Sequence, residues 1–164
     1  MADVPASSQL ARLRAKADAA RQAQYVDCHL EPVGMVVRYG PLTVDQIDDI
    51  RRRSKAGAKE NVAVLVEACQ ALLVVDDDGQ LVSLDPDGTC YVDDDGTLQG
   101  DPVTFSSSKT AELLEVDSAS AAVDLIYGMA GRSLQVARDA DDVVFLSRGE
   151  TSRMSRPTRA GSGR

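Results

Sequence analysis

The first stretch of the chain with a regular pattern of apolar and polar positions is residues 7–24. Alanine, leucine, arginine, lysine and glutamine, all good helix formers, follow serines that can cap a helix, so this stretch is predicted to be helical. Its apolar face is thin, because Leu10 and Leu13 are its only large apolar residues. We expect either an exposed helical arm or a helix that docks on a partner.

The pattern changes to short apolar stretches over residues 25–39. Apolar residues alternate before Pro32-Val33-Gly34 and resume directly after it, which is typical of a β-hairpin. Thr43 and Gln46 then stand at the spacing of a capping box, in which each residue's side chain bonds the backbone N–H of the other. A helix is predicted over about 44–54.

Residues 59–75 form the most apolar segment. Large apolar residues recur there at helical spacing, with alanine and valine between them. They are Val62, Leu65, Val66, Cys69, Leu72 and Leu73. A helix that is apolar over most of its circumference has to be central, so we expect one long helix here that carries the fold.

Three Asp-rich turns that end in glycine follow, at 76–79, 85–88 and 93–96. Glycine supplies the positive φ that such turns need, and aspartate tolerates the adjoining conformations. The stretches 81–84 and 89–92 lie between the turns. The pattern predicts a small β-meander.

Helical periodicity returns in the last third of the chain. One short helix is expected over about 109–116, a second after a cap at Asp117 or Ser118, and a third from Ser133. The apolar run 143–146 fits either the end of the third helix or a short buried strand, because periodicity does not separate the two over four residues.

These elements predict a mainly helical α+β domain with a short N-terminal hairpin and a small meander. The chain divides into a basic helical arm (1–24), a globular domain (25–147) and an Arg/Ser/Gly-rich tail (148–164) that is expected to be disordered. The formal charges of these parts are +2, −14 and +4. An acidic body repels phosphate backbones, and only 4% of the residues are aromatic, so nucleic acid is not expected as a partner.

Catalytic and metal-binding signatures are absent from the sequence. His29 is the only histidine, and its neighbour Cys28 would point to the opposite face of a strand, so the two should not form a nucleophile pair. The Asp-rich turns do not match the register of a calcium loop. We therefore expect no enzyme activity, no metal and no cofactor.

No targeting or membrane segment is recognisable either. The start Met-Ala-Asp-Val-Pro lacks the apolar stretch of a signal peptide, and the three cysteines are widely spaced. No apolar run reaches the length of a membrane span. A cytoplasmic protein with no membrane partner is expected.

The order of elements resembles the tail assembly chaperones of long-tailed phages and prophages of actinobacteria, over about residues 8–147. The resemblance rests on these pieces in this order: Leu10-Ala11-Arg12-Leu13-Arg14-Ala15-Lys16, Val36-Val37-Arg38-Tyr39-Gly40-Pro41-Leu42, Val62-Ala63-Val64-Leu65-Val66-Glu67-Ala68-Cys69, Leu73-Val74-Val75-Asp76-Asp77-Asp78-Gly79, Leu81-Val82-Ser83-Leu84-Asp85, and two terminal helices.

The resemblance implies a function in virion morphogenesis in the host cytoplasm. A protein of this family binds the tape measure protein and keeps its apolar segments soluble while tail tube subunits polymerise around it. The role implies no catalysis and no cofactor, and it is compatible with self-association. The alternative is a structural virion protein, such as a head-tail joining or tail-completion component.

Two apolar stripes are candidates for the partner-binding surface. One is the thin stripe of Leu10 and Leu13 in the arm, and the other is the stripe of Val123, Ile126 and Tyr127 in the second of the last three helices. Helical apolar stripes also pack inside a monomer, so core packing of either stripe remains the alternative.

Overall fold

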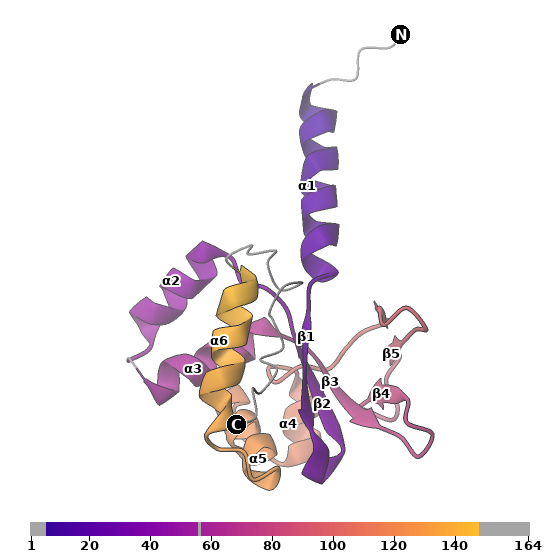
Figure 1. Ribbon diagram of the computed structural model, residues 1–164, viewed down its shortest axis with the longest axis vertical. Helices are drawn as coiled ribbons and strands as arrows, with labels where there is room; N and C mark the ends of the chain where they lie inside the picture. The colour runs from indigo at the N-terminus through magenta and orange to yellow at the C-terminus, as the bar shows by residue number, and fades with distance from the viewer. Residues whose placement is uncertain (1–5, 56, 148–164) are drawn as a thin grey trace, which may run out of the picture.

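An antiparallel sheet of six strands forms the centre of the computed structural model, which describes residues 6–55 and 57–147 (Figure 1). The strands are β1 (Val26–Leu30), β2 (Met35–Tyr39), β3 (Cys69–Val75), β4 (Leu81–Ser83), β5 (Tyr91–Val92) and β6 (Leu98–Gln99). Neighbours in the sheet are neighbours in sequence, and the sheet curls into a half-barrel. About half of this α+β domain is helical.

Helices cover one face of this sheet, and one helix stands clear of it. In chain order, the helical elements are α1 (Ala6–Gln22), the 3-10 turn η1 (Glu31–Val33), α2 (Val44–Arg53), α3 (Ala58–Ala68), α4 (Ser108–Leu114), α5 (Ala119–Met129) and α6 (Gln135–Ser147). Helix α6 packs on α3, and α5 packs on α3 beside it. Helix α1 projects away from the body (Figure 1).

The sheet has an apolar layer on each of its faces. Strand β2 pairs with β3 so that Val37 stands opposite Leu72 and Val36 opposite Leu73. Val37 and Leu72 belong to the main core beneath the helices, whereas Val36 and Leu73 belong to a smaller cluster on the other face. The curl of the sheet brings β4 to β6 over that second cluster, so the central strands are buried on both sides.

The structure confirms the predicted hairpin, capping box and meander. Gly34 ends the turn between β1 and β2 with a φ of 65°, which favours glycine. At the start of α2, Thr43 Oγ1 accepts a bond from Gln46 N at 3.2 Å, and Gln46 Oε1 accepts one from Thr43 N at 2.8 Å. The predicted helix over 44–54 therefore begins and ends within a residue of its expected bounds.

The single long helix expected over 59–75 is wrong in its second half. Helix α3 ends at Ala68, and Cys69 is already extended, with φ −63° and ψ 119°. The Ala68 carbonyl accepts a bond from Gly40 N at 2.8 Å, just before the pairing of β2 with β3. A strand buried on both faces is apolar at every position, so its sequence pattern continues that of the buried helix before it.

The aspartates of the meander hold its turns through their own side chains. Asp76 Oδ1 accepts from Gln80 N at 2.8 Å, and Asp93 Oδ1 accepts from Thr97 N at 2.9 Å. Asp85 Oδ1 accepts from Asp87 N at 3.1 Å. These bonds are the turn chemistry expected from the sequence, and they engage the carboxylates locally.

The last three helices lie where the sequence predicts them. Ser118 caps α5 by accepting a bond from Ala121 N, and residues 143–146 are the end of α6 rather than a strand. The tail expected to be disordered, 148–164, lies outside the described residues. None of the helices in the described part of the chain has the length and apolar character to cross a bilayer.

Candidate partner-binding surfaces

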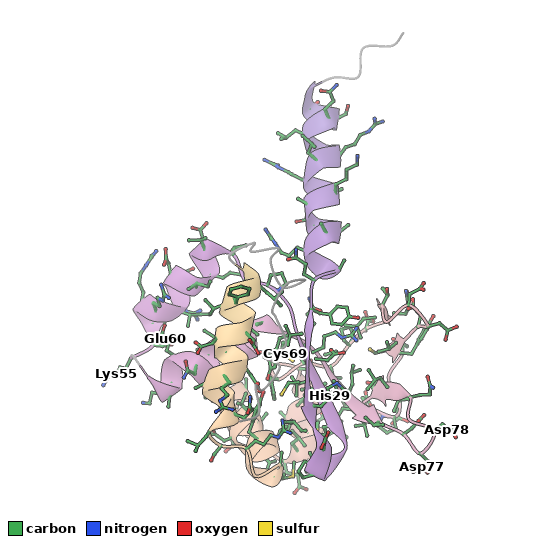
Figure 2. All side chains as sticks on the ribbon, viewed as in Figure 1. His29, Lys55, Glu60, Cys69, Asp77 and Asp78 are labelled. Atoms are coloured by element: carbon green, nitrogen blue, oxygen red, sulfur yellow. The ribbon has the colours of Figure 1, made fainter. Side chains whose placement is uncertain are left out.

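Helix α1 is a 17-residue arm whose side chains are exposed at every position from 9 to 21. Leu10 is 50% exposed and Leu13 is 63% exposed, so the structure leaves the predicted arm stripe accessible. Figure 2 shows the arm's side chains pointing into solvent on all sides. Most of the stability of a helix in a protein comes from packing of its apolar face, so a partner that covers one face of α1 would stabilise it.

The arm has an apolar stripe with basic flanks. The stripe has the spacing i, i+3, i+7 and i+10: Leu10, Leu13, Ala17 and Ala20. Arg14 and Arg21 border it on one side and Lys16 on the other, by helical geometry. A stripe of this kind is suited to packing against another helix, and its basic flanks would attract acidic side chains.

A buried arginine fixes the root of the arm. Arg38 on β2 is 2% exposed; its Nε and Nη2 donate to the two carboxylate oxygens of Asp27 at 2.8 and 3.0 Å. Its Nη1 donates to the Gly96 carbonyl at 2.6 Å, and its guanidinium lies 3.9 Å from the ring centre of Tyr25. Because Tyr25 joins the arm to β1, these contacts set the direction in which the arm leaves the body.

A cavity of about 630 Å³ opens between the arm root and the end of the meander. It is lined by Ala19, Ala23, Tyr25, Arg38, Gln70, Asp95, Gly96, Thr97, Leu98 and Pro102. Arg38 is the one cationic side chain in this lining, and its charge is paired with Asp27. The cavity therefore separates the arm root from the meander, and its lining holds no unpaired cation that could bind an anionic ligand.

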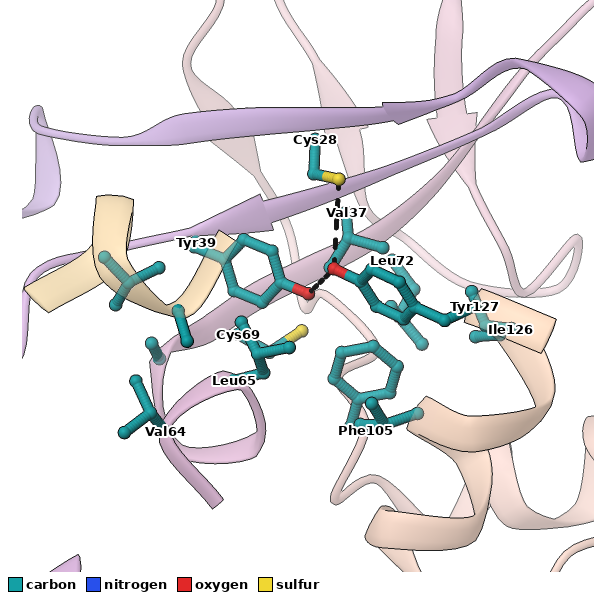
Figure 3. Packing of buried hydrophobic residues seen from close by; sticks show 14 of the residues in the cluster. Cys28, Val37, Tyr39, Val64, Leu65, Cys69, Leu72, Phe105, Ile126 and Tyr127 are labelled. Atoms are coloured by element: carbon teal, nitrogen blue, oxygen red, sulfur yellow. Dashed lines mark hydrogen bonds between the residues drawn. The ribbon is translucent and has the colours of Figure 1, made fainter. Parts of the chain in front are cut away.

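A polar network lies inside the core, where β1 and β2 meet α5 and α6. Asp139 Oδ2 accepts from Cys28 Sγ at 2.9 Å and from Tyr127 Oη at 2.8 Å, and its Oδ1 accepts from Gln135 Nε2 at 3.1 Å. Tyr39 Oη lies 2.5 Å from Tyr127 Oη. Figure 3 shows Tyr127 between Cys28 and Tyr39, surrounded by apolar side chains.

The network keeps its thiol protonated. Burial, followed by the hydrogen bond to Asp139, raises the pKa of Cys28 from 9.0 to about 12. Burial likewise raises the pKa of Cys69 to about 12 and lifts the pKa of Tyr127 well above its usual value. A thiol attacks as its thiolate, so these cysteines are inert at neutral pH, and the network is suited to holding α6 on the sheet.

The second predicted stripe does not form a surface in this structure. Val123 and Ile126 are 0% exposed and Tyr127 is 1% exposed, all within the main core. They face the sheet and α3 because α5 has to bury one apolar face, and this is the one that it buries. Their prediction as partner-binding residues is therefore wrong for the folded chain, because a partner cannot reach buried side chains.

The opposite face of the same helix is the surface that the sequence reading missed. Leu125 is 37% exposed and Met129 is 47% exposed, and Leu134, just beyond the helix, is 89% exposed. The sequence does contain a signal for this second apolar face, because α5 is apolar around nearly its whole circumference. Only one of its faces can reach the core.

No side-chain cluster in residues 6–55 and 57–147 has the makings of a metal site. His29 is exposed and Cys28 is buried, on opposite faces of β1, as expected. The three cysteines are buried and form no disulfide. In the described residues, α1 and α5 each expose at least two large apolar side chains on one helix face, whereas α2 and α4 expose a single one each, Val44 and Leu113.

We compared the chain with protein-family models, with curated proteins and with solved structures, and none of the three comparisons found a match.

Proposed function

We propose that this chain is a non-enzymatic tail assembly chaperone that captures helical segments of a tape measure protein through the arm α1. The observation that carries the proposal is the exposure of Leu10 and Leu13 on a helix that stands clear of the body. A long helical partner needs its apolar stripes covered before assembly, and the arm presents a matching stripe.

Charge supports the same role. The arm's basic flanks attract acidic helical segments and speed their encounter, while the −14 charge of residues 25–147 keeps a loaded complex soluble. The inert state of the buried thiols is consistent with a protein that binds rather than catalyses. Tail tube subunits would then meet the partner only as the chaperone leaves it.

A co-expression pull-down tests the proposal, with the product of the large neighbouring open reading frame as the tape measure candidate. Leu13→Asp should lower capture by about tenfold or more, since it puts a charge in the centre of the stripe. Val44→Asp is the matched control, because Val44 is 67% exposed on α2 and carries the same change away from the arm. Equal capture by both variants would contradict the role of the arm.

A further inference from the structure

The outer face of α5 is an apolar helix surface that no element of the described residues covers. It consists of Ala121, Leu125, Gly128 and Met129, which lie at the spacing i, i+4, i+7 and i+8. Gly128 has no atom within 4 Å of the position that a Cβ would occupy. A second helix could therefore approach the backbone of α5 closely at this point, with a leucine and a methionine on either side of it.

The segment that carries this face is acidic. Segment 108–130, which contains α4 and α5, holds one basic and four acidic side chains, a net charge of −3. The acidic residues, all exposed, are Glu112, Glu115, Asp117 and Asp124. The arm α1 holds four basic side chains and one acidic one, a net charge of +3. The two surfaces are complementary in charge, and each offers an apolar stripe to the other.

The arm cannot reach the α5 face of its own chain. Figure 1 shows α1 at one end of the long axis of the molecule and α5 at the other. The arm stripe from Leu10 to Ala20 spans about 15 Å, and α5 from Ala119 to Met129 also spans about 15 Å, at a rise of 1.5 Å per helical residue. The lengths match, and only a second molecule can bring the two surfaces together.

We propose that the arm of one copy packs its Leu10 and Leu13 stripe on the outer face of α5 of a second copy. The contact joins different surfaces of the two molecules, so it is head-to-tail and leaves one arm and one α5 face available for further copies. The interface covers a single helix face, so the association is weak and depends on concentration.

Two symmetric contacts are less favourable than this one. Pairing two arms would bring Arg14, Lys16 and Arg21 of both copies together, and pairing two α5 faces would bring the acidic side chains of both copies together. Like charges across a small interface oppose association, whereas the head-to-tail contact places opposite charges at its rim.

Sedimentation velocity of the full chain over about 5–500 µM tests the proposal, because a weak interface has a Kd on the order of micromolar to millimolar. The wild type should shift from monomer to a series of larger species. Leu13→Asp and Met129→Asp should each remain monomeric alone. Mixed in equal amounts, they should form a dimer that does not grow, because the mixture contains one intact arm and one intact α5 face.

Three results would overturn the head-to-tail contact. They are a wild type that stays monomeric at every concentration, a variant mixture that stays monomeric, and a Met129→Asp protein that assembles like the wild type. Tyr91→Asp, at a side chain 56% exposed on β5, is the control for a surface charge elsewhere. Leu10→Asp and Leu125→Asp repeat the test if either first variant melts differently from the wild type.

This inference and the proposed function can fail separately. Met129→Asp should lose self-association and still capture the tape measure candidate, since its arm is intact. A partner helix that occupies the arm stripe should also displace the neighbouring copy. If the wild type captures the candidate but does not self-associate, the result supports the chaperone role and contradicts the head-to-tail contact.

Discussion

The residues that close the domain are polar and buried. Asp139 on α6 accepts hydrogen bonds from Cys28, Tyr127 and Gln135, so one carboxylate ties a strand and two helices together. Within the described residues, no buried side-chain nitrogen or oxygen lacks a partner. A satisfied network of this kind fixes a unique packing, and removing one member leaves the others unpaired at a cost in stability.

The buried thiols predict that the folded chain loses stability in mild alkali. The pKa of Cys28 and that of Cys69 are about 12 in the folded chain against 9.0 as ordinary values, so the unfolded thiols lose their protons first. Stability is therefore complete below pH 9 and falls as the pH rises toward 12. The free energy of unfolding should drop by about 1.4 kcal/mol per thiol between pH 8 and pH 10.

Urea unfolding at pH 8, 9 and 10 measures this drop. Cys28→Ser keeps a donor for Asp139 and removes one titrating group, so its stability should fall less steeply with pH than that of the wild type. A free energy of unfolding that stays level to pH 10 in the wild type would contradict the burial of the thiols.

Among the elements, the sequence predicts correctly what a local bond decides, and it predicts poorly what depends on distant parts of the chain. The capping box of Thr43 and Gln46 marks the start of α2 to the residue, because the cap is a local bond between named side chains. The end of α3 at Ala68 has no such local mark. Whether 69–75 is helix or strand depends on β2 and β4, which pair with it from elsewhere in the chain.

Helix α3 packs at the centre of the main core, and a substitution of Leu65 tests how much this helix contributes to stability. This side chain is fully buried in the main core, so Leu65→Ala should lower the free energy of unfolding by about 2–5 kcal/mol through the cavity it leaves. Leu113→Ala, at a side chain 41% exposed on α4, should cost less than about 1 kcal/mol. Chemical denaturation measures both; a loss below about 0.5 kcal/mol for Leu65→Ala would mean that α3 is not core.

The apolar faces that α1 and α5 expose lie at opposite ends of the long axis of the molecule (Figure 1). The arm stripe of Leu10 and Leu13 was predictable, because a thin stripe on a basic terminal helix has too little apolar surface to bury. The burial of Val123 and Ile126 was not predictable. Helix α5 is apolar on both sides, and periodicity does not say which side meets the sheet. Tertiary packing makes that choice.

Amide hydrogen exchange measures most directly whether α1 is an unpacked helix that a bound partner would order, as proposed above. In the dilute wild-type chain, amides of residues 10–20 should exchange rapidly while those of β2 and β3 stay protected, because the arm has no packing to hold it. With the tape measure candidate bound, the arm amides should become protected. Capture of that candidate with no change in the exchange of residues 10–20 would contradict binding through the arm.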